Sequence, residues 1–103
     1  MGAHALEDQH MAKLIGNLRI SAVPGSEGKK PHYAVEFLPY TGRLKTQPAT
    51  AQSFDDLVAL LTELRIEEDE ANRYAGQIRV QGTILVPNFE RTDSFLKEQK
   101  LLG

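Results

Sequence analysis

The sequence contains no cysteine among its 103 residues. A disulfide framework, a thiolate nucleophile and a cysteine-based zinc or iron–sulfur site are therefore excluded. The sequence also lacks any apolar run approaching the roughly 20 residues that cross a bilayer, and it shows no signal-peptide pattern. We therefore expect a soluble, cytoplasmic protein without a membrane partner, whose stability comes from packing.

Neither positive nor negative residues strongly predominate, because the sequence has 12 Lys and Arg against 14 Asp and Glu. Residues 1–10 show no apolar periodicity and end beside His10-Met11, which is typical of a leader left by cloning. We expect this leader to be disordered and residues 11–103 to form a single domain. Without Glu7 and Asp8 the chain is about neutral, so its overall charge indicates no partner.

Two stretches of alternating apolar and polar residues predict β-strands. Residues 14–23 alternate in this way, and residues 33–37 do the same after the polar loop 25–31. The two strands are therefore expected to form a hairpin. Residues 44–50 predict a third, weaker strand, which Pro48 places at a sheet edge.

Helical spacing of apolar residues follows in the second half of the chain. It predicts a helix over residues 54–65, with Ser53 as the capping residue. A second helix is expected to begin near Glu67 and to end at Gly82. Because only Arg65-Ile66 separates the two helices, they should form a tight helical hairpin.

Residues 83–86 predict a last short strand, stopped by Pro87, and a short helix is expected after Thr92. The predicted fold class is α+β: a mostly antiparallel sheet of three or four strands, a helical hairpin on one face and a short C-terminal helix. The predicted core consists of Leu18, Ile20, Val35, Phe37, Leu57, Leu61, Leu64, Tyr74, Ile78, Ile84 and Val86.

A Gly28-Lys29 pair after a strand is reminiscent of a phosphate-binding loop. Val23, however, stands where such a loop has its first glycine, and Lys30 stands where it needs Ser or Thr. Pro31 and a strand replace the helix whose amides would hold the phosphate. We interpret this segment as a solvated hairpin loop.

His32 shares a strand face with Glu36, and a carboxylate beside an imidazole can support proton transfer near neutral pH. No nucleophile accompanies the two residues, so we assign no catalytic residue. The acidic run 67–70 lacks the spacing of a calcium loop and is interpreted as a solvated helix start. We therefore expect no metal and no cofactor.

Charge is segregated along the chain. Residues 11–52 hold six cations against two carboxylates, a balance of +4, whereas residues 53–73 hold two against seven, a balance of −5. This predicts a basic hairpin end and an acidic helical end. The tentative binding residues are Lys29, Lys30, His32, Arg43 and Lys45.

No residues diagnostic of a known family are present, although the layout resembles that of many small bacterial proteins. The leading hypothesis is a non-enzymatic binding or adaptor module that acts through protein contacts. The alternative is a nucleic-acid-binding protein that uses the basic hairpin, and the third is a small hydrolase or isomerase with a site near His32. An exposed strand edge would favour the first, a continuous basic face the second and a deep pocket the third. The sequence indicates neither the partner nor the oligomeric state.

Overall fold

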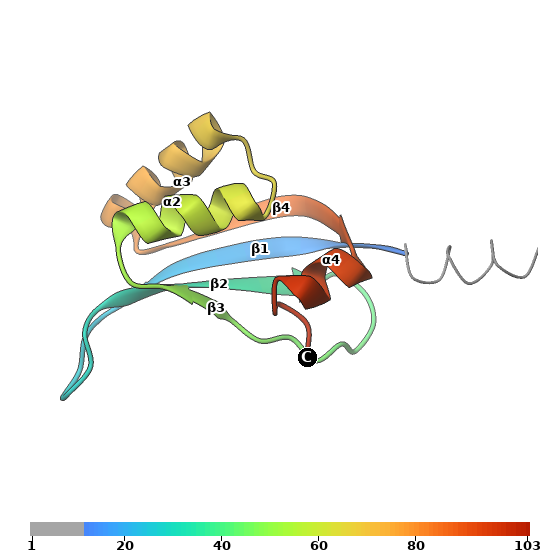
Figure 1. Cartoon of the computed structure of the whole chain (residues 1–103), viewed down its shortest axis with the longest axis horizontal. Helices are drawn as coiled ribbons and strands as arrows, with labels where there is room; N and C mark the ends of the chain where they lie inside the picture. The colour runs from blue at the N-terminus through green and yellow to red at the C-terminus, as the bar shows by residue number, and fades with distance from the viewer. Residues whose placement is uncertain (1–11) are drawn as a thin grey trace, which may run out of the picture.

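Four antiparallel strands form one sheet, in the spatial order β3-β2-β1-β4 (Figure 1). The computed structural model describes residues 12–103, so the leader predicted for residues 1–10 lies outside the described residues. The strands are β1 (Lys13–Val23), β2 (His32–Pro39), β3 (Ala49–Ala51) and β4 (Thr83–Thr92). Together with the helices, this sheet confirms the predicted α+β fold.

Three helices accompany the sheet: α2 (Phe54–Glu63), α3 (Glu68–Gln81) and α4 (Asp93–Glu98). The predicted cap of α2 is present, because the Asp56 backbone N–H donates a hydrogen bond to Ser53 Oγ at 3.1 Å. Gly82 ends α3 with a φ of +80°, a left-handed conformation that glycine adopts without a steric penalty. The two longer helices form the expected hairpin over the sheet.

All three helices pack on the same face of the sheet (Figure 1). Leu18, Phe37, Leu61, Ala75 and Leu96 supply fully buried side chains from β1, β2, α2, α3 and α4. Nine of the predicted core residues are buried, whereas Tyr74 and Val86 are partly buried against that core. Within residues 12–103, no helix covers the opposite face of the sheet.

The predicted end of the last strand at Pro87 is wrong, because β4 continues to Thr92. Proline lacks a backbone N–H, and β4 is an edge strand, where one side of the ladder needs no donor. The third strand is shorter than expected and begins just after Pro48. It lies at the other edge, as predicted.

A β-bulge changes which residues of β4 face the core. The register between β1 and β4 shifts between Gly16 and Leu18, and Asn88 on β4 has a φ of +56°. Ile84 faces the core before the bulge, and Phe89 faces it afterwards, where its ring lies 6.2 Å from that of Phe37. The bulge therefore adds Phe89 to the core.

Candidate functional site

One face of the sheet has no helix packed on it within residues 12–103, and we call it the open face. On β1, Leu18 and Ile20 point to the helices and are buried, whereas Arg19 between them is exposed. The same alternation on the neighbouring strands, in register with β1, identifies the other residues of the open face. The open face consists of Lys13, Ile15, Asn17, Arg19, Ser21, Val23, His32, Ala34, Glu36, Leu38, Thr50, Thr83, Leu85, Glu90 and Thr92.

An ion pair lies in the middle of the open face. Arg19 and Glu36 are directly opposite each other on β1 and β2, and Arg19 Nη2 donates a hydrogen bond to Glu36 Oε1. On β4, which pairs with the other edge of β1, Leu85 is directly opposite Arg19. Leu85 is 54% exposed. A solvent-accessible ion pair contributes little to folding stability. The side chains of Arg19 and Glu36 are 46% and 24% exposed, so both charges can contact another molecule.

A shallow hollow of about 360 Å³ lies next to the ion pair. Small side chains open this space, since Ser21 and Ala34 face each other across β1 and β2. Pro48 and Thr83 line it from either side. The open face thus carries both a projecting leucine and a recess beside it.

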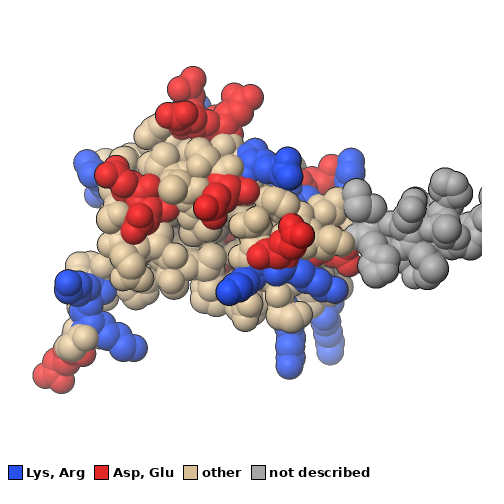
Figure 2. Space-filling view, viewed as in Figure 1, with Lys and Arg blue, Asp and Glu red and all other residues tan. Residues whose placement is uncertain are grey.

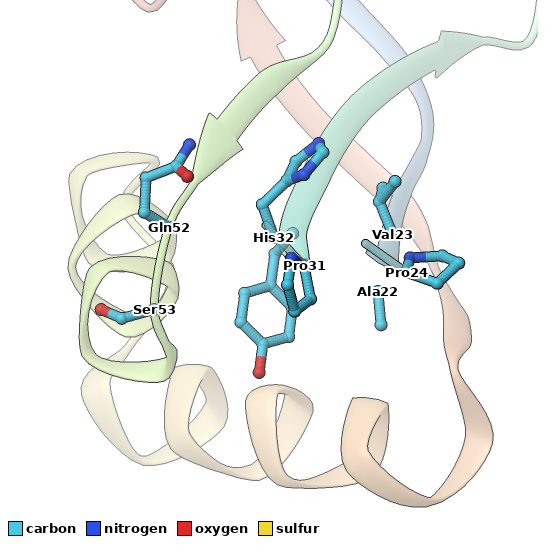
Figure 3. A pocket seen from close by; sticks show the side chains of 8 residues that line it. Ala22, Val23, Pro24, Pro31, His32, Gln52 and Ser53 are labelled. Atoms are coloured by element: carbon cyan, nitrogen blue, oxygen red, sulfur yellow. The ribbon is translucent and has the colours of Figure 1, made fainter. Parts of the chain in front are cut away.

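His32 lines a separate pocket of about 440 Å³ at the root of the β1–β2 hairpin (Figure 3). The other lining residues are largely apolar: Ala22, Val23, Pro24, Pro31, Tyr33, Gln52 and Ser53. His32 Nδ1 lies 3.3 Å from the Lys30 carbonyl oxygen. Ser53 Oγ accepts the capping hydrogen bond of α2, and its side chain points away from the imidazole in Figure 3. The pocket does not bring a nucleophile to His32.

The pairing of His32 with Glu36 that proton transfer would need is not formed. The two residues share a face, but they are four positions apart, which is about 13 Å along a strand. Glu36 instead pairs with Arg19 of the neighbouring strand. His32 is opposite Val23 in the register of the hairpin. The structure thus offers His32 no carboxylate for proton transfer from its own strand.

The four cations predicted to bind a partner lie at two separate ends of β2. Lys29 and Lys30 are exposed near the tip of the β1–β2 hairpin, whereas Arg43 and Lys45 are exposed in the segment between β2 and β3. The eight residues of β2 span about 27 Å. Figure 2 shows basic side chains along the protruding hairpin, an acidic side chain at its very end and acidic side chains over the helices. The four cations therefore do not form one continuous patch, and whether they bind a ligand stays a prediction.

The contacts of Arg91 with the end of α2 were not predicted from the sequence. Its Nε donates a hydrogen bond to the Leu64 carbonyl at 2.9 Å, and its Nη2 donates one to the Arg65 carbonyl at 3.1 Å. Burial, together with the positive charge of Arg65, lowers the pKa of Arg91. The guanidinium also lies 4.2 Å from the centre of the Phe89 ring. Because these donors satisfy carbonyls where α2 ends, we assign Arg91 a structural role.

Arg65 completes a second hollow beside Arg91. This hollow of about 340 Å³ is lined by Lys13, Arg65, Glu90, Arg91, Thr92 and Phe95. Arg65 lies over the Phe95 ring at 5.2 Å, and Lys13 Nζ is 3.9 Å from Glu90 Oε1. Within residues 12–103, no group of three or more His, Cys, Asp or Glu side chains is arranged to hold a metal ion.

Among the helices of residues 12–103, none combines the length and apolar character needed to cross a membrane. Comparisons of the chain with protein-family models, with curated proteins and with solved structures found no match. The functional proposal therefore depends on the surfaces described above.

Proposed function

We propose that this chain is a small, non-enzymatic binding module of the cytoplasm that contacts protein through its open face. The observation that carries the proposal is the uncovered side of the sheet, with Leu85 54% exposed beside the Arg19–Glu36 pair. Leu85 is accompanied by Ile15, which is 41% exposed, and by the partly buried Leu38. These apolar side chains lie on one face of the sheet, about 7 to 13 Å from Leu85 along the strands, and a sheet face that carries exposed apolar side chains without a packing partner is a candidate interaction site.

The composition of the open face also supports a protein partner. Protein interfaces combine an apolar centre with few charges, and arginine is enriched in them. The Arg19–Glu36 pair and the Lys13–Glu90 pair supply two Lys or Arg cations and two carboxylates among the open-face residues, so these charges balance. A polyanion such as nucleic acid would instead need a row of cations. The open face therefore suits a protein surface better than a phosphate backbone.

The experiment places a photo-reactive phenylalanine analogue at Leu85 on the open face. As a matched control, the same analogue replaces Val80, an 87% exposed residue of α3. After irradiation in an extract of the source cells, we expect a defined protein adduct from position 85 that competes away with excess unmodified chain. Position 80 should give none. Equal labelling from both positions, or none from either, would contradict the proposal.

A further inference from the structure

We propose that the partner of the open face is a second copy of this chain, bound face to face about a two-fold axis. This inference rests on the proposed function, because it uses the same surface and adds the identity of the occupant. In a two-fold interface each copy contributes the same patch, so that patch must complement itself in charge and in shape. The open face meets both requirements.

The charges on the open face are self-complementary. Arg19 and Glu36 lie side by side on adjacent strands near its centre. When a second copy is turned over onto the face, Arg19 of each copy can lie against Glu36 of the other. Two reciprocal contacts then join the copies, with no excess charge to repel them.

The shape of the open face is self-complementary as well. Leu85 projects at the register position of Arg19, and the hollow opens around Ser21 and Ala34, two residues further along the strands. Two residues correspond to about 7 Å, which is a side-chain-sized offset. A two-fold axis in the plane between the sheets can therefore seat Leu85 of each copy in the hollow of the other. The same axis keeps Arg19 close to Glu36 of the second copy.

The area of the open face suits a reversible dimer. Four strands about 4.8 Å apart, with a mean length of eight residues, give roughly 500 Å² per copy in projection. Side-chain relief increases this value toward the roughly 800 Å² that each partner buries in an interface of standard size. We therefore expect exchange between monomer and dimer rather than permanent association.

The test is sedimentation velocity over a range of concentrations, with Arg19→Glu and Glu36→Arg as separate variants. Wild type should dimerise, and each variant alone should associate at least about tenfold more weakly, because like charges then meet twice across the interface. A one-to-one mixture of the two variants should recover the dimer. Arg73→Glu makes the same charge change at an exposed residue of α3 and should dimerise like wild type.

The mixing experiment distinguishes charge pairing between two copies from charge pairing within one copy. In each single variant, residues 19 and 36 of the same chain carry like charges, and mixing two chains cannot repair that internal pair. Recovery in the mixture therefore requires residues 19 and 36 of one copy to face these residues of the other across the interface. Circular dichroism melts of both variants would establish that they are folded.

A monomeric wild type at millimolar concentration would overturn the inference, as would a dimer that neither variant weakens or a mixture that stays monomeric. A different result would contradict the proposed function. If wild type is monomeric but position 85 still crosslinks to a different protein, the second copy is the wrong occupant and the open face remains a binding surface. If position 85 crosslinks to nothing, both proposals fail.

Discussion

The hydroxyl oxygen of Tyr40 accepts a hydrogen bond from the backbone N–H of Asn88 at 2.9 Å, which joins the end of β2 to the outer strand β4. The same hydroxyl donates to Asn17 Oδ1 on β1, also at 2.9 Å. Asn88 adopts its left-handed φ beside the bulge. One side chain thus connects three strands where the register shifts.

Tyr40→Phe should lower the free energy of unfolding by about 1 kcal/mol, because it removes the hydroxyl but keeps the ring. Chemical denaturation measures the change. Tyr74→Phe is the control: its hydroxyl donates to Glu70 Oε2 on the same helix at 3.1 Å, and we expect a loss of about 0.2–0.5 kcal/mol. Equal losses in the two variants would show that Tyr40 does not fix the bulge.

Gly16→Ala should destabilise the fold by about 1–3 kcal/mol, as expected for overpacking. A Cβ atom at this position would lie 2.2 Å from the Leu38 carbonyl oxygen, so β1 and β2 would have to move apart. In Gly76→Ala on α3, the new methyl group meets nothing within 4 Å and the helix gains about 0.5–1 kcal/mol. Thermal melts should therefore move in opposite directions, and a shared direction would contradict this packing.

Much of the fold could be predicted because its signals are local. The alternation in residues 14–23 and the Ser53 cap each depend on neighbours within a few positions. The continuation of β4 past Pro87 could not be predicted, because proline is tolerated only where a strand lies at an edge, and edge position is a tertiary property. Phe89 could not be predicted as a core residue, because the bulge interrupts the alternation of inward-facing and outward-facing residues along β4.

The candidate site, too, could be predicted only in part from local patterns in the sequence. Alternation correctly predicted that His32 and Glu36 share a face, but the hairpin register decided that Glu36 pairs with Arg19. That no helix of residues 12–103 covers the open face depends on where the three helices pack. No local pattern in the sequence indicates this.

Arg91→Leu should cost about 1–3 kcal/mol, because the Leu64 carbonyl at the end of α2 then loses its charged donor. Arg91→Lys should recover little of the loss, since an ammonium group cannot reproduce the fork that reaches two carbonyls at once. Urea denaturation of both variants measures the difference. Full stability of the lysine variant would mean that charge alone, rather than the fork, sustains this contact.

The last prediction concerns the basic hairpin and oligonucleotides. Lys29 and Lys30 are exposed on the hairpin loop, but Glu27 is exposed on the same loop, and Arg43 and Lys45 lie at the other end of β2. A single strand that meets only the two lysines would release few counterions. The logarithm of its binding constant should therefore fall with the logarithm of salt concentration by a slope of about −1.4, that is, about −0.7 for each phosphate.

We therefore expect weak binding to a fluorescent single-stranded oligonucleotide at low salt and none measurable at physiological salt, by fluorescence anisotropy. The double variant Lys29→Glu, Lys30→Glu should remain folded and still dimerise, because neither residue belongs to the open face. Sub-micromolar binding at physiological salt, abolished in this double variant, would make nucleic acid the better assignment. The two functions are thus tested with different residues, because Lys29 and Lys30 lie on the hairpin loop after β1, whereas Arg19 lies within β1 on the open face.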